Sequence, residues 1–171
     1  AYARASHRPG VALGYLTPGQ PGLTHVLHAE NFRELPRDQD DLISAIDRSF
    51  QAAVIAKDRL QAVAVSIGPG GFTSTRMACA AGAMIAEALK IPAIPVPSAL
   101  VAWQAHGSFS TRVAVALAGK GPSAWVRLFN GSDHTHQGEV LLADQLLALA
   151  PDVVLADAPL PVPIRDALVN G

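Results

Sequence analysis

Apolar residues in the first third of the chain form two short runs and one helical face. The runs, residues 11–16 and 23–27, flank a segment rich in Pro and Gly, which predicts two paired strands joined by a reversal of the chain. Between residues 40 and 56, apolar side chains recur at helical spacing, at Leu42, Ile43, Ile46, Phe50, Ala53 and Val54. Asp38, Asp40 and Asp41 stand at the start of this segment, as the helix dipole favours. The segment is therefore predicted to be an amphipathic helix.

Strand-like and helix-like segments alternate in the middle of the chain. Residues 61–67 are almost all Ala, Val or Ile, which is typical of a strand covered on both faces in a parallel or mixed central sheet. A helix is predicted over residues 75–89, a strand over 91–96, and a short helix from Ser98, whose side chain suits an N-cap. This order predicts an α/β fold with a mixed sheet and flanking helices.

The last third repeats this order less regularly. Strands are predicted over residues 113–118, 124–129 and 153–156, and a helix over residues 143–149. A few Gly and Ser residues near position 106 mark a boundary. We therefore expect an N-terminal lobe over residues 1–105 and a smaller C-terminal lobe over residues 106–171.

Composition adds expectations about partners and compartment. Half of the 171 residues are hydrophobic and only 16% are charged, which suggests that apolar surface meets another chain. The net charge of −1 does not favour direct binding of nucleic acid. Cys79 is the single cysteine, so no internal disulfide is expected. We therefore expect a reducing, cytoplasmic location. The sequence has no run of about 18 apolar residues, so no membrane span is predicted.

A glycine-rich loop joins the strand at residues 61–67 to the following helix. Gly68, Gly70 and Gly71, with Thr73 and Arg76 after them, could direct backbone N–H groups toward an anion at a helix N-terminus. The loop lacks the Gly-Lys-Ser/Thr ending of a P-loop and does not match the Gly-x-Gly-x-x-Gly dinucleotide pattern. A tight strand-to-helix turn is the alternative interpretation. Arg76 either binds an anion or pairs with a carboxylate across an interface.

The helix behind this loop is apolar on all sides. One face carries larger residues, and the opposite face carries the row Ala78, Gly82 and Ala86. A helix of this kind must be covered twice, once by its own sheet and once by another helix. We expect the small-residue row, with Ile46 and Phe50 of the preceding helix, to form a partner interface. The alternative is that the chain's own helix at residues 40–56 covers the row.

No constellation of side chains predicts catalysis or a metal site. His134 and His136 follow a turn-like segment and are interpreted as a hairpin tip. His25 and His28 point to opposite faces if their strand is regular. Cys79 has small apolar neighbours in the sequence and is interpreted as buried and inert. The sequence therefore predicts no catalytic residue and no metal ligand.

Residues 62–100 resemble the bacterial TsaB (YeaZ) family, whose members carry a Gly-Pro-Gly-Ser-Phe-Thr-Gly-Leu-Arg loop before an alanine-rich helix. Gly71 replaces the serine of that motif, and Ser74-Thr75 replaces its Gly-Leu. The positions that match are Gly68, Pro69, Gly70, Phe72, Thr73 and Arg76. Downstream, Ile91-Pro92 and Pro97-Ser98-Ala99-Leu100 keep the register.

The resemblance implies an actin-like, Hsp70-like ATPase fold of the ribonuclease H-like type, with a smaller or truncated second lobe. It implies an accessory, non-catalytic role beside the catalytic subunit TsaD in forming threonylcarbamoyladenosine at position 37 of tRNA, which this chain would meet only indirectly. It also implies a homodimer when the chain is alone, and ATP or ADP at a partner interface. Ala3-Arg4-Ala5-Ser6 lacks the acidic residue of the family's phosphate loop, so nucleotide hydrolysis is not expected.

Two other functions stay open from the sequence. The first is a small enzyme or sensor that binds a phosphate or nucleotide at the Gly68–Gly71 loop. The second is a diverged homodimer outside the tRNA-modification pathway.

Overall fold

The chain folds into two compact units in a computed structural model that describes residues 2–5, 10–17, 24–33, 41–106, 111–119, 121–131, 137–157 and 160–170. The sheet unit comprises Ala1–His7, Ala64–Cys79 and Pro95–Gly171. The hairpin unit comprises Arg8–Val63 and Ala80–Ile94. The units are interleaved in the sequence, whereas the sequence predicted one division after residue 105.

A five-stranded mixed sheet forms the centre of the sheet unit, in the order β1-β9-β6-β7-β8. β9 lies parallel to both β1 and β6, whereas β7 is antiparallel to β6 and β8. The strands are β1 (Tyr2–Ala5), β6 (Arg112–Ala118), β7 (Ala124–Asn130), β8 (Glu139–Leu141) and β9 (Val153–Asp157). The sequence pattern predicted β6, β7 and β9. It missed β1 and β8 because three or four residues are too few to establish a period.

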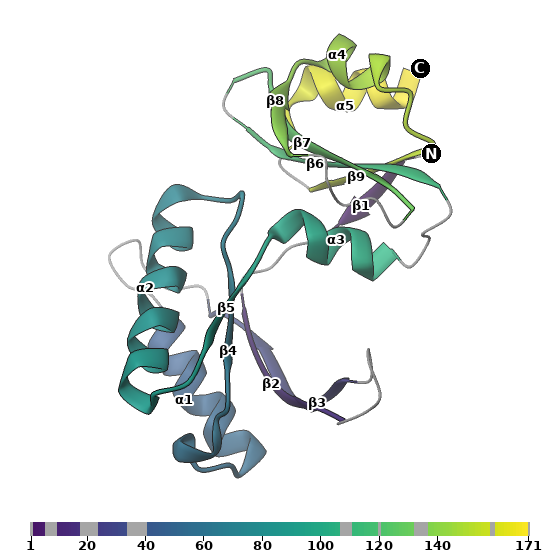
Figure 1. The fold of residues 1–171 in the computed structure, drawn as a ribbon. Helices are drawn as coiled ribbons and strands as arrows, with labels where there is room; N and C mark the ends of the chain where they lie inside the picture. Colours follow the sequence, from purple (N-terminus) through teal and green to yellow (C-terminus); the bar gives the residue numbers. More distant parts are fainter. Residues whose placement is uncertain are drawn as a thin grey trace. The chain divides into compact units, whose positions relative to one another are not determined.

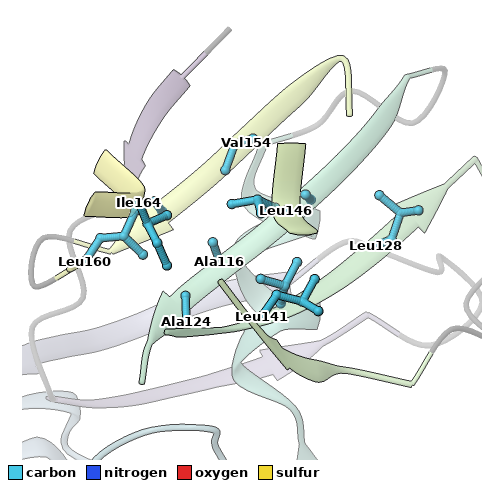
Figure 2. Close-up of a cluster of buried hydrophobic side chains, with 11 residues drawn as sticks. Ala116, Ala124, Leu128, Leu141, Leu146, Val154, Leu160 and Ile164 are labelled. Carbon is cyan, nitrogen blue, oxygen red and sulfur yellow. The ribbon is translucent and has the colours of Figure 1, made fainter. Parts of the chain in front are cut away.

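Helices cover both faces of this sheet (Figure 1). α4 (Ala143–Ala148) and α5 (Val162–Asn170) lie on one face, and α3 (Ser98–His106) lies on the other. Figure 2 shows Leu146 of α4 and Ile164 of α5 beside Ala116 of the sheet. Side chains in β6 alternate between the two cores, because successive residues of a strand point to opposite faces. α5 was not predicted from the sequence.

Aromatic stacking organises the core under α3. The rings of Trp103 and Phe129 lie 5.0 Å apart between centroids and nearly parallel. The guanidinium of Arg127 lies 5.0 Å from the centroid of the same Phe129 ring. Phe129 has no exposed surface. This cluster fixes α3, which the sequence predicted from its Ser98 start, onto the sheet.

The hairpin unit begins with the predicted pair of strands, β2 (Gly10–Leu16) and β3 (Thr24–Asn31), which are antiparallel. α1 (Leu42–Ala53) packs on both strands and is followed by the 3-10 helix η1 (Lys57–Arg59). The register shifts between Leu13 and Gly14. His28 therefore pairs with Leu13, and His25 with Tyr15, so both histidines lie on one face. The expectation of opposite faces was wrong, because a β-bulge adds one residue between them.

β4 (Val63–Ser66) and β5 (Ala93–Val96) pair in a two-stranded sheet. In the sequence, α2 (Phe72–Leu89) lies between them. α2 begins three residues earlier than the sequence predicted. Ala64 and Ser66 of β4 are exposed, and Val63 and Val65 are half-buried. The expectation of a central strand covered on both faces was therefore wrong. Runs of apolar residues show that a strand can be buried, but the number of covering elements depends on tertiary packing.

Candidate partner-binding site

An apolar groove of about 610 Å³ opens between α1 and the C-terminal half of α2, within the hairpin unit. Ile43 of α1 is 62% exposed, and Met84, next to the groove residue Ile85, is 71% exposed. The lining residues are Ile43, Ser44, Ile46, Asp47, Arg48, Phe50, Lys57, Ile85, Ala88 and Leu89. The groove is thus a hydrophobic depression with exposed aliphatic side chains beside it, the surface expected of a site for another chain.

The two faces of α1 explain why the groove faces outward. Ala45 and Ser49 are buried one helical turn apart, and the Ser49 hydroxyl donates to the Ala45 carbonyl oxygen at 2.9 Å. On the neighbouring face, Ile43 is exposed and Ile46, three residues later, is half-buried, whereas Phe50, four residues further on, is itself buried. The periodicity in the sequence therefore supplies more apolar residues than the core of the hairpin unit covers. The excess forms one wall of the groove.

An ion-pair network anchors α1 to β3. Nη1 and Nη2 of Arg48 donate to Oδ1 and Oδ2 of Asp41, at 2.9 and 2.7 Å. Nε of Arg48 donates to both carboxylate oxygens of Glu30 at 3.2 Å. The backbone N–H of Arg33 donates to Oδ2 of Asp41 at 2.8 Å. Arg48 also lines the groove, so the network holds the helix that forms one of its walls.

Electrostatics in this network keep both partners charged. The hydrogen bonds from Arg48, and then the bond from the Arg33 backbone, lower the pKa of Asp41 to about 2. The hydrogen bond to Asp41, and then that to Glu30, raises the pKa of Arg48 above its ordinary value. Asp41 stands at the N-cap of α1 but makes no side-chain capping bond there. Its carboxylate therefore serves tertiary anchoring instead of capping.

The structure divides the predicted interface residues into two groups. Ile46 and Phe50 line the groove, Ile46 half-buried and Phe50 only 8% exposed. Gly82 and Ala86 are buried within the chain, and Ala78 is half-buried. Gly82 and Ala86 of the small-residue row therefore face inward in this chain, and a partner interface formed by the row stays a prediction. Both faces of α2 are apolar and small, so periodicity could not indicate which one the chain itself covers.

Several groove residues were missing from the predicted interface. Arg48, Lys57 and Leu89 line it but were not singled out from the sequence. For Arg48 a signal existed, because Asp41 lies seven residues earlier and thus on the same helical face. Lys57 follows the end of α1 by only four residues. No local pattern indicates that Leu89 of α2 lies beside α1, because that proximity is tertiary.

The glycine loop lies in the sheet unit at the start of α2. Gly68 is buried with φ +86°, and its carbonyl oxygen accepts from the N–H of Ser98 at 2.9 Å. Gly70, Gly71, Thr73 and Arg76 are exposed. The guanidinium of Arg76 lies 5.2 Å from the ring centroid of Phe72. The loop acts as the strand-to-helix turn foreseen as one alternative, and anion binding there stays a prediction.

The remaining candidates for chemistry are dispersed. In the part of the chain that the structure describes, no three His, Cys, Asp or Glu side chains gather as metal ligands would. Cys79 is half-buried, and His134 and His136 lie outside the described residues. None of the described helices combines the length and hydrophobicity needed to cross a bilayer.

Comparison with known proteins defines the family. The model of the TsaD family, tRNA N6-adenosine threonylcarbamoyltransferase, matches residues 37–140. Because this is more than half of the chain, the chain belongs to that family. The match includes α1, α2 and the groove between them.

Two solved structures from Pseudomonas aeruginosa share the fold. The first is an uncharacterized protein with similarity to peptidase YEAZ, at TM-score 0.64 and 17% identity, covering 95% of this chain and 86% of that one. The second is YeaZ, at TM-score 0.62 and 18% identity, covering 95% of this chain and 85% of that one. No curated protein sequence matches the chain. The resemblance to the TsaB (YeaZ) family and the mixed α/β, actin-like fold are confirmed by these matches.

Proposed function

We propose that this chain is a non-catalytic subunit that supports threonylcarbamoyladenosine formation at position 37 of tRNA by docking a TsaD-like catalytic partner. The observation that carries the proposal is the apolar groove between α1 and α2, inside the segment that matches the TsaD family. The name of that family, tRNA N6-adenosine threonylcarbamoyltransferase, supports a role in forming threonylcarbamoyladenosine in tRNA. The chemistry of the groove supports a role in binding another chain.

The groove suits the packing of apolar helices. Its charged residues are already engaged within the chain, since Asp47 pairs with Lys57, and Arg48 pairs with Asp41 and Glu30. A partner therefore meets a surface whose apolar atoms need cover and whose charges are largely neutralised. Amphipathic helices bind such grooves through anchors at i, i+3, i+4 and i+7. A partner of the same family would present helices equivalent to α1 and α2.

Replacement of Ile43 by Glu tests the docking proposal. The added carboxylate would have to lose water on binding, so we expect affinity for the host's TsaD-like protein to fall at least about tenfold. Val169→Glu is the matched control, because Val169 is an exposed aliphatic residue of α5, 69% exposed against 62% for Ile43. Light scattering on mixtures would report the complex. A wild-type chain that forms no complex, or an Ile43→Glu variant that binds as tightly as wild type, would refute the docking surface.

The pathway assignment has its own test in cells. Deletion of the gene should lower the level of threonylcarbamoyladenosine in tRNA, and wild type should restore it. The Ile43→Glu variant should not restore it, whereas Val169→Glu should. The purified chain alone should form no modified nucleoside, and activity in that assay would overturn the non-catalytic assignment. If the chain stays a homodimer when the partner is added, and the deletion leaves the level of threonylcarbamoyladenosine unchanged, the protein is a diverged one outside the pathway.

Phosphate or nucleotide binding at the glycine loop is the second candidate. The exposed Gly70, Gly71 and Thr73 at the N-terminus of the long helix α2 favour it, because N–H groups there attract anions. ATP, ADP or phosphate at millimolar concentration should then raise the melting temperature, and a Gly70→Asp variant should lose that rise. An unchanged melting temperature for wild type with all three would reject this candidate, including a nucleotide held by this chain alone.

A further inference from the structure

Val54 ends α1 in a backbone conformation that valine rarely adopts. Its φ and ψ are 55° and 43°, in the left-handed region. The N–H of Val54 donates to the Gln51 carbonyl oxygen and the N–H of Ile55 to that of Phe50, which caps the helix. Glycine usually occupies such a position, and for a β-branched residue the conformation is a steric outlier. The other described non-glycine residues with positive φ, Lys90 and Ala150, are not β-branched.

The folded chain offers this side chain no compensating burial. Val54 is 90% exposed, the largest fraction among the exposed large hydrophobic residues of the described chain. An apolar side chain stabilises a fold by leaving water, so an exposed valine contributes almost nothing in that way. Backbone strain and exposure therefore both count against valine within the isolated chain.

The surroundings of Val54 connect it to the docking groove. It lines a second, open depression of about 630 Å³ at the end of α1, with Asp47, Phe50, Gln51, Ile55, Ala56 and Lys57. Asp47, Phe50 and Lys57 also line the groove between α1 and α2, so the two depressions adjoin. Asp47 is neutralised by Lys57 and also accepts from the side chain of Gln51 at 3.0 Å. The surface around Val54 thus has internally paired charges and an apolar centre.

We propose that Val54 is an anchor of the docking surface, whose isopropyl group enters an apolar socket on the TsaD-like partner. The inference rests on the proposed function, because it extends the α1/α2 groove to the end of α1. Val54 stands at the C-terminal end of α1 and lines a depression that shares Asp47, Phe50 and Lys57 with the groove. Burial in the complex supplies the stabilisation that the free chain lacks, and pockets filled by such anchors dominate the affinity of interfaces.

Substitution by glycine separates anchoring from folding. Val54→Gly relieves the left-handed strain, so its melting temperature should rise or hold, by about 2–4 °C at most. The same variant should bind the TsaD-like protein about tenfold more weakly. Ala150→Gly is the matched control, since Ala150 is also left-handed, with φ 46°, but follows α4 in the sheet unit. It should gain stability in the same way and bind as wild type does.

A second variant tests whether Val54→Gly weakens binding only because glycine loosens the end of α1. Val54→Asn keeps a side chain that tolerates the left-handed region but replaces the apolar anchor with an amide. It should also bind about tenfold more weakly, with the fold intact by circular dichroism. If both Val54 variants bind the partner as tightly as wild type while Ile43→Glu still loses binding, the role of Val54 as an anchor is overturned and the docking groove is not. A wild-type chain with no affinity for the partner would overturn the proposed function and the anchor together.

Discussion

Arg48 and Asp41 lie seven residues apart and form a two-point ion pair, with Nη2 of Arg48 2.7 Å from Oδ2 of Asp41. The Asp41 side chain is almost fully buried, and that of Arg48 is about one-quarter exposed. Because Arg48 also bonds Glu30 of β3, the pair sets how α1 rotates against the hairpin. The rotation decides which face of α1 reaches the groove.

Replacing Arg48 with Met should destabilise the chain in a way that depends on pH. In the folded chain the pKa of Asp41 is lowered to about 2, against about 3.9 in an unfolded peptide. The pair therefore contributes its full stability above the unfolded value, and this contribution is lost as the pH falls toward 2. The difference in unfolding free energy between wild type and Arg48→Met should be largest near pH 6 and shrink on acidification.

Urea unfolding between pH 6 and pH 2.5 would measure that difference. Arg165→Met is the control, because Arg165 pairs with Asp166 at 3.7 Å on an exposed surface. Exposed pairs of this kind contribute little to stability. A difference for Arg48→Met that stays constant over the pH range would contradict the assigned role of Asp41.

Truncation of Phe129 to Ala should cost about 3–5 kcal/mol of unfolding free energy. The residue is fully buried and stacks on Trp103, so the change removes apolar contacts and leaves a cavity. Phe72→Ala offers the same chemistry at a site that is 75% exposed, and its cost should stay within about 0.5 kcal/mol. Equal costs for the two variants would contradict the core under α3.

Alanine substitutions within the glycine loop should separate two neighbouring positions. Gly68 has φ +86°, so Gly68→Ala should cost about 1–2 kcal/mol through backbone strain. A Cβ at Gly71 would meet only the Ser74 hydroxyl, at 2.9 Å. That hydroxyl donates to the Gly71 carbonyl oxygen at 3.0 Å on an exposed surface, so water can replace the bond when the group rotates away. Gly71→Ala should therefore change stability by less than about 0.5 kcal/mol, as thermal unfolding would show. A reversed order would contradict the conformation of the loop.

Salt should have little effect on docking. The charged residues of the groove are paired within the chain, so the complex should gain little from charges on the partner. We expect affinity to change less than about threefold between 50 and 500 mM NaCl. A fall of tenfold or more, measured by calorimetry, would show that unpaired charges dominate the interface.

Local patterns in the sequence determined most of the elements. The hairpin of β2 and β3, the helix α1 and the strands β6, β7 and β9 were predicted because side-chain periodicity and turn residues act over a few positions. The Gly68 motif also indicated the family, because a loop with several special positions is specific. Ile46 and Phe50 were predicted to be interface residues from the same local periodicity, and their contact with a partner stays a prediction.

Tertiary structure alone decided which surfaces became available. Gly82 and Ala86 turned inward while Met84 turned outward, although both faces of α2 are apolar in the sequence. β1 found its partner β9 about 150 residues away, with Tyr2 opposite Val154. Chain folding also brought Leu89 of α2 beside α1. Periodicity shows that a face is apolar, but what covers it depends on contacts between segments distant in the chain, which no local pattern encodes.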